Sequence, residues 1–154
     1  MELDHFSYRC GVIDCFNEMV RAGLKPMALA HPCPTRAERD SYLPFCREIC
    51  GKYGTRFFPE DDMLLTDLFP LSANRGTFNI IFYREEAVRR AYEALKAEKA
   101  ALQAAGTYGG EARRRLACAF GALLGYPEAD CLRLMEANTE REPDSEGGRA
   151  VPCR

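Results

Sequence analysis

One stretch, TFNIIFYR over residues 77–84, gives the strongest strand signal in the chain and most constrains its fold. β-branched and aromatic residues dominate this stretch, as is typical of strands. A segment rich in Ala, Glu, Lys and Leu follows directly over residues 85–105, and its apolar residues recur at helical spacing. These two elements indicate a sheet that is covered by helices.

Apolar periodicity and glycine or proline stops predict the other helices. A capping box formed by Thr35 and Glu38 starts one of them, which ends at Gly54. Pro44 lies inside this helix and removes an intrahelical hydrogen bond, so we expect a kink or a restart near Leu43. The remaining helices are predicted over residues 4–22, 111–124 and 127–138.

Two further strands are predicted, over residues 26–32 and 55–59. Residues 63–69 are ambiguous between a strand and a short helix, and we favour the strand. Residues 71–76 contain Ser, Asn and Gly and are predicted to form a loop. The first strand–helix–strand unit implies a parallel pair with a right-handed crossover, and residues 63–84 imply a hairpin.

The predicted fold class is therefore α/β (α+β mixed), with a small mixed sheet of three or four strands covered by helices and a C-terminal helical segment. A length of 154 residues and a hydrophobic fraction of 47% suffice for one domain with its own core, which we place at residues 1–138. Residues 139–154 contain almost no apolar side chains and are predicted to be a disordered tail.

The charge of the chain is nearly balanced, with 21 basic and 23 acidic residues. This balance argues against a nucleic-acid-binding protein, which needs a basic face, and we interpret the cluster at residues 113–115 as a solvated helix face. No signal peptide is visible, because residues 1–4 are acidic and no apolar segment follows. Apolar runs are also far shorter than the roughly 20 residues of a membrane-spanning helix. We therefore expect a cytoplasmic protein without membrane contact.

The chain contains eight cysteines but no C-x-x-C motif and no cysteine–histidine spacing typical of a zinc site. We interpret most of them as reduced, buried thiols. The acidic turn at residues 60–62 could hold Mg²⁺, but no phosphate-binding loop accompanies it, so a solvated turn is favoured. No metal and no cofactor is predicted.

Ligands of α/β sheets bind beyond the carboxyl ends of parallel strands. In the predicted topology three such ends meet at one edge of the sheet. His31 and Cys33 follow the first strand, residues 60–62 the second, and residues 83–85 the last. The helix that starts at Thr35 would present its N-terminal amides to the same edge, where they favour an anion.

His31 and Cys33 each precede a proline in the stretch HPCPT. A residue before proline takes extended geometry, and residues i and i+2 of an extended chain point to the same side. Cys33 could therefore act as a nucleophile or redox thiol with His31 as its base. The sequence identifies neither a group that orients the histidine nor an oxyanion hole. The favoured interpretation is a turn in which His31 bonds a local carbonyl.

Asp67 is a carboxylate within an apolar segment. Such a residue is either paired with a cation or functional, because an unpaired buried charge is costly. We favour a structural ion pair, with Arg75 or Arg56 as the partner.

Three stretches carry a family resemblance: AGLKP (22–26), IIFYREEAVRRAYEAL (80–95) and FGALLGYPEADCLRLMEAN (120–138). The last is the most distinctive, because a Gly-Tyr-Pro break separates two helices. There Gly125 can supply a left-handed cap and Pro127 can start the next helix. Together the stretches resemble an uncharacterised bacterial family, the domain of unknown function 3793. The resemblance implies no activity, because the family has none established.

Three functions fit the sequence. The favoured one is a small binding or regulatory module without chemistry of its own, which holds a small anionic ligand or a protein partner at the strand-end edge. Its candidate ligand-binding residues are Thr35, Asp67, Arg75, Tyr83 and Arg84. One alternative is an enzyme or redox protein that uses Cys33 and His31. The other is a protein-interaction or homodimerisation module that uses the helices of residues 85–138.

Overall fold

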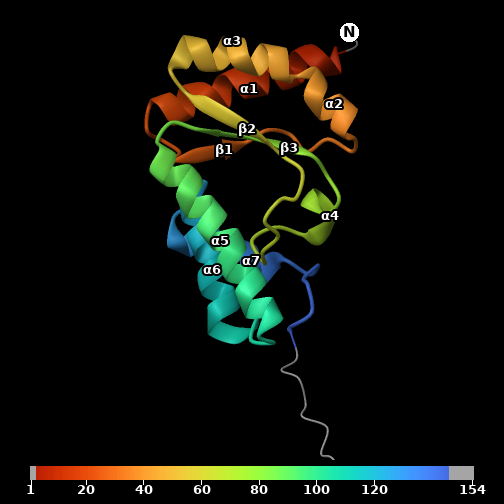
Figure 1. Ribbon diagram of the computed structural model, residues 1–154, viewed down its shortest axis with the longest axis vertical. Helices are drawn as coiled ribbons and strands as arrows, with labels where there is room; N and C mark the ends of the chain where they lie inside the picture. Colours follow the sequence, from red (N-terminus) through yellow and green to blue (C-terminus); the bar gives the residue numbers. More distant parts are fainter. Residues whose placement is uncertain (1–2, 146–154) are drawn as a thin grey trace, which may run out of the picture.

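A computed structural model describes residues 3–145 of the chain. Within this range seven helices and three strands cover one another in layers (Figure 1), which confirms the predicted α/β fold class. The elements are α1 (His5–Arg21), β1 (Met27–Leu29), α2 (Arg36–Ser41), α3 (Leu43–Tyr53), β2 (Arg56–Glu60), α4 (Leu71–Asn74), β3 (Asn79–Tyr83), α5 (Glu86–Ala104), α6 (Gly110–Leu123) and α7 (Glu128–Ala137).

The sheet is antiparallel, with the strand order β1-β3-β2. Ile81 of β3 lies opposite Leu29 of β1 on one side and opposite Phe58 of β2 on the other. β1 and β2 therefore run in the same direction but do not pair, so the predicted parallel pair is wrong. The physical reason is that all five residues of β3 are buried. Such a strand is most stable in the centre of the sheet, where it separates β1 from β2.

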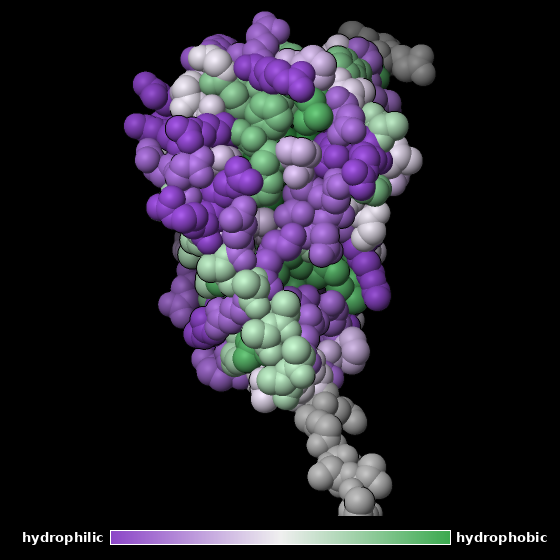
Figure 2. Space-filling model, in the orientation of Figure 1, coloured by the Kyte–Doolittle hydropathy of each residue, from purple (hydrophilic) through white to green (hydrophobic). Residues whose placement is uncertain are grey.

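Alternate residues of the strands face two separate cores. Ala28, Ile80 and Phe82 pack against α1 and α3, which cover one face of the sheet (Figure 1). Ile81 and Tyr83 belong to the second core on the opposite face, which α5, α6 and α7 cover. Hydrophilic residues cover most of the molecular face in Figure 2, and apolar residues gather in separate patches between them.

The restart predicted near Leu43 is confirmed. Thr35 caps α2, since its side chain accepts a hydrogen bond from the Glu38 amide at 3.2 Å. α2 then ends, and α3 begins at Leu43 with Pro44 in its first turn, where a missing amide proton costs no helical hydrogen bond. Gly54 ends α3 in the left-handed conformation, with φ of 67°.

Residues 61–70 contain no strand, so the predicted strand at 63–69 and its hairpin are wrong. Side chains bind the backbone amides that a strand would offer to a neighbour. The Leu64 amide donates to Tyr92 Oη at 3.1 Å, and the Leu68 amide donates to Thr66 Oγ1 at 3.2 Å. The apolar side chains of this loop still fill the second core. The predicted loop that follows contains the short helix α4.

The sequence predicts a disordered tail from Thr139, whereas the structure lays residues 139–145 along the body of the domain (Figure 1). We call these residues the C-terminal strap. The Leu71 amide donates to the carbonyl of Glu140 at 3.2 Å, and the Ser145 amide donates to the carbonyl of Tyr108 at 3.0 Å. The rest of the predicted tail lies outside the described residues.

Candidate functional site

The strand-end edge predicted as a ligand site does not assemble. Because β3 is antiparallel to both neighbours, residues 83–85 lie at the opposite edge from Cys33 and Glu60. There Tyr83 Oη donates to Glu86 Oε1 at 3.0 Å, and Arg84 donates to the main-chain carbonyl of Arg21 at 3.4 Å. The three strand ends therefore form two separate regions.

His31 and Cys33 lie in different surroundings, because His31 is exposed and Cys33 is buried. The Cys33 thiol donates to the main-chain carbonyl of His31 at 3.6 Å, and Arg9 Nη1 lies 3.6 Å from the same sulfur. Burial raises the pKa of the Cys33 thiol, although the nearby Arg9 and Arg39 act in the opposite direction. Cys33 also exchanges two backbone hydrogen bonds of 2.9 Å with Phe78, so this stretch extends the pairing of β1 with β3.

Cys33 is expected to react slowly with iodoacetamide in the folded protein, and more slowly than the exposed Cys15. Burial hides the sulfur and lowers the thiolate fraction, which is the reactive form. Peptide mapping by mass spectrometry at several pH values measures both rates. A His31→Ala variant should alkylate Cys33 at the wild-type rate, and a clear loss of rate would instead support the Cys33–His31 pair.

The edge near Thr35 is occupied by ion pairs. Arg39 is only 3% exposed and contacts Asp61 at 2.9 Å, while Arg36 contacts the same carboxylate at 2.8 Å. Glu60 accepts hydrogen bonds from Tyr92 Oη at 2.8 Å and from Lys96 Nζ at 3.0 Å. Two acids of the turn are therefore paired with cations, whereas a solvated turn is predicted from the sequence.

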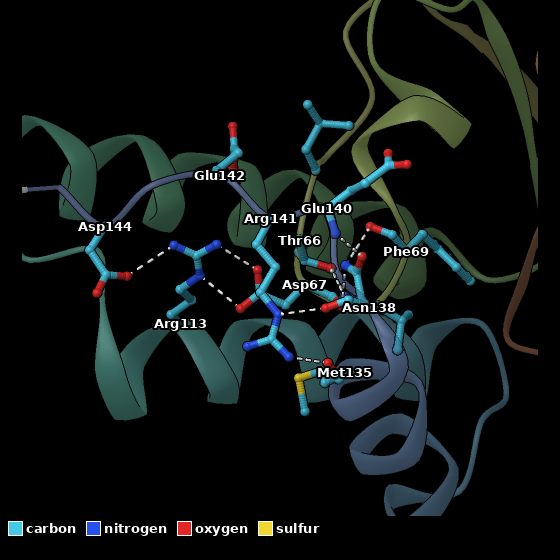
Figure 3. A network of polar contacts seen from close by, with 12 residues as sticks. Thr66, Asp67, Phe69, Arg113, Met135, Asn138, Glu140, Arg141, Glu142 and Asp144 are labelled. Atoms are coloured by element: carbon cyan, nitrogen blue, oxygen red, sulfur yellow. Dashed lines mark hydrogen bonds and ion pairs between the residues drawn. The ribbon is translucent and has the colours of Figure 1, made fainter.

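Asp67 forms the buried ion pair that its position predicts, but with a different partner. Arg113 of α6 binds it through two parallel hydrogen bonds, Nε to Oδ2 at 2.7 Å and Nη2 to Oδ1 at 2.6 Å (Figure 3). Both side chains are less than 10% exposed. Arg56 instead contacts Glu86 at 2.6 Å, and Arg75 is exposed at the end of α4. The predicted partners are therefore wrong.

A cleft of about 550 Å³ lies beside this ion pair. Elements far apart in the sequence form it: the loop of Asp67, helices α6 and α7, and the C-terminal strap (Figure 3). Leu132 and Met135 give it an apolar wall. The complete lining is Asp67, Gly110, Arg113, Arg114, Leu132, Met135, Glu136, Arg141, Glu142 and Asp144.

Asn138 fixes the cleft where α7 ends. Its buried side-chain amide donates to the carbonyls of Asp67 at 3.0 Å and Phe69 at 3.1 Å, which ties the Asp67 loop to α7 (Figure 3). Arg141 donates to the carbonyls of Asn138 and Met135, where the helix dipole favours a cation. The Asp67 carboxylate raises the pKa of Arg113 above its ordinary value, so Arg113 stays charged.

The lining residues offer guanidinium groups, carboxylates and apolar side chains, but no thiol, imidazole or hydroxyl group. Three of the four carboxylates are already paired: Asp67 and Asp144 with Arg113, and Glu142 with Lys99. Among residues 3–145, no cluster of three or more His, Cys, Asp or Glu side chains could hold a metal ion. The same part of the chain has no helix long and apolar enough to span a bilayer.

Sequence reasoning missed Arg113, Asn138 and Arg141. One signal for Arg113 was available, because it stands three and seven residues before Leu116 and Phe120 and so shares their buried helical stripe. The interpretation of residues 113–115 as a solvated face is therefore wrong for Arg113 alone, since Arg114 and Arg115 are exposed.

Comparison with known proteins identifies no relative. No model of a known protein family matches the chain, and neither curated proteins nor solved structures contain a similar one. The resemblance to the domain of unknown function 3793 therefore stays a prediction.

Proposed function

We propose that this protein is a binding module, without chemistry of its own, that holds a small organic acid in the cleft beside the Asp67–Arg113 pair. The observation that carries the proposal is that two arginines line the cleft without contacting a carboxylate of residues 3–145. Arg114 and Arg141 have no carboxylate partner among the described residues, whereas Glu136 is the one lining acid without a cation partner there. The guanidinium of Arg114 and the N–H groups of Arg141 that do not bond the carbonyls of Asn138 and Met135 can therefore bind an anionic group.

The apolar wall narrows the class of ligand. Leu132 and Met135 lie in the same cleft as the two arginines, so a ligand with a carboxylate and a short aliphatic or aromatic body can satisfy both. Arginine is well suited to this role because its planar guanidinium can bind a carboxylate through two hydrogen bonds. This proposal keeps the anionic ligand class predicted from the sequence and moves it to a different part of the fold.

Hexanoate is expected to raise the melting temperature of the protein, because a ligand that binds only the folded state stabilises it. Differential scanning fluorimetry measures the rise, with sodium chloride at equal ionic strength as the reference. Replacing both Arg114 and Arg141 by alanine should abolish it. Arg115→Ala is the matched control, since Arg115 neighbours Arg114, contacts Glu98 and does not line the cleft.

Two results would contradict the proposal. One is an equal rise in the doubly substituted variant and in the Arg115→Ala control. The other is an equal rise with hexylamine, which carries the opposite charge on a similar apolar body.

A further inference from the structure

The acidic residues of the C-terminal strap occupy every second position and each contacts the body of the domain. Glu140 Oε2 accepts a hydrogen bond from the Ser72 amide at 2.9 Å. Glu142 contacts Lys99 Nζ at 2.5 Å, and Asp144 contacts Arg113 Nη1 at 3.0 Å. The strap is therefore an acidic segment bound through three carboxylates at alternate positions.

The surface that receives these carboxylates combines the main-chain amide of an exposed residue with three buried side chains, and we call it the strap site: the Ser72 amide, Lys99, Tyr108 and Arg113. The side chains of Lys99 and Arg113 are less than 10% exposed, and both cations lie over the ring of Tyr108, at 5.2 Å and 5.0 Å from its centre. Tyr108 is 1% exposed, and its hydroxyl has no hydrogen-bond partner among the described residues.

The two cations are held in place by groups outside the strap. Lys99 Nζ donates to the carbonyl of Leu65 at 2.7 Å, and Arg113 is fixed by Asp67. They keep these partners when the strap leaves, so the strap site is preorganised for carboxylates. The strap is held less firmly than the two cations, because the Asp144 side chain is 69% exposed.

We propose that the strap site docks an extended acidic segment of another protein, with carboxylates at alternate positions, and that the strap competes with this partner by occupying the site in cis. Charge complementarity and the seated strap define the partner's chemistry. While the strap covers the site, a partner cannot bind there. The apparent affinity for the partner is therefore reduced in proportion to the fraction of molecules whose site is empty. Arg113, Glu142 and Asp144 also line the cleft, whereas Lys99 and Ser72 do not, so peptide binding measured without an organic acid tests this site independently of the proposed function.

The two sites share the strap, and this predicts competition between their ligands. Arg141, Glu142 and Asp144 belong to the strap and also line the cleft. A partner that displaces the strap takes Arg141 away from a bound organic acid. Coupling of this kind is reciprocal, so the organic acid would in turn weaken docking of the partner.

A peptide that copies the strap, TEREPDS with a fluorescent label, tests the docking site by anisotropy against the full chain. In a Glu142→Gln, Asp144→Asn chain the cis strap is weakened and the strap site is intact. This chain should bind the peptide roughly 5- to 10-fold more tightly than the wild type. Glu48→Gln is the matched control, because Glu48 is an exposed acid of α3 outside both the strap and the cleft, and it should leave the affinity unchanged.

A charge exchange tests the register of docking. In the Glu142→Gln, Asp144→Asn chain, Lys99→Glu should weaken binding of TEREPDS, and the peptide TERKPDS, with lysine at the place of Glu142, should restore it. A thermal melt shows whether the Lys99→Glu variant is folded. If it is not, the peptide affinity of the Glu142→Gln, Asp144→Asn chain decides the outcome alone. Equal binding of TEREPDS and of TQRQPNS, in which amides replace the three carboxylates, overturns the proposal, as does an unchanged affinity in the Glu142→Gln, Asp144→Asn chain. A doubled mass of the wild-type chain in sedimentation, abolished by those two substitutions, also overturns it, because the natural occupant is then the strap of a second copy.

Discussion

Asp67→Ala is expected to lower the free energy of unfolding by about 3–5 kcal/mol, the usual cost of removing one member of a buried ion pair. The substitution leaves the buried guanidinium of Arg113 without its two strongest hydrogen bonds. Asp144 contacts Arg113 from an exposed position and cannot replace a buried partner. Urea unfolding followed by circular dichroism measures the change.

Arg56→Ala is the matched control for Asp67→Ala, since Arg56 is one of the partners predicted from the sequence. Its contact with Glu86 lies at the surface, where an ion pair contributes at most about 1 kcal/mol. A second comparison replaces Asp67 and Arg113 together by leucine and methionine, which should recover much of the loss because no buried charge remains. Equal losses of stability in Asp67→Ala and Arg56→Ala would show that the buried pair stabilises the domain no more than a surface pair does.

Gly121→Ala is expected to destabilise the protein by about 1–3 kcal/mol, the usual cost of overpacking a core. Gly121 lies in the middle of α6, where alanine would otherwise favour the helix. The added Cβ would lie 2.3 Å from Cys131 Sγ of α7, closer than two such atoms can approach. Thermal unfolding of the variant measures the effect.

Two further variants separate crowding from helix propensity. Gly51→Ala in α3 has the same chemistry, but its Cβ meets nothing within 4 Å, so it should stabilise the protein by about 0.4–1 kcal/mol. Cys131→Ala removes the sulfur, and in combination with Gly121→Ala it should restore most of the lost stability. A double variant no more stable than Gly121→Ala alone would show that the close approach of α6 and α7 is not the cause.

Local signals explain which parts of the fold could be predicted. The strand at residues 77–84, the long helix after it and the restart at Leu43 depend on neighbouring residues, and all three are confirmed. The strand order depends on which strand lies in the centre, and the buried run NIIFY of β3 determines it. Residues 63–69 differ from the prediction because Tyr92, 28 residues after Leu64, binds a backbone amide there. Periodicity within a segment carries no information about such a contact.

The candidate site shows the same difference between signals from neighbouring residues and contacts between distant ones. The sequence indicates that Asp67 needs a cation, because that follows from its apolar neighbours. Its partner Arg113 stands 46 residues away on another helix, and the contact between Lys99 and Glu142 spans 43 residues. A lack of apolar residues predicts that a tail is disordered when it has no binding partner. It gives no information about the acids at alternate positions, Glu140, Glu142 and Asp144, which contact the body of the domain.

The sheet has consequences for aggregation, because both of its outer strands carry unpaired backbone groups along one side. Such edges can recruit strands from other molecules and build fibrils. In this sheet β1 has only three residues and follows Pro26, and Pro32, which has no amide proton, stands between β1 and the bridge at Cys33. β2 contains the exposed Pro59, which has no amide proton to offer to an added strand. Short length at one edge and proline at the other protect the folded domain against edge-to-edge polymerisation.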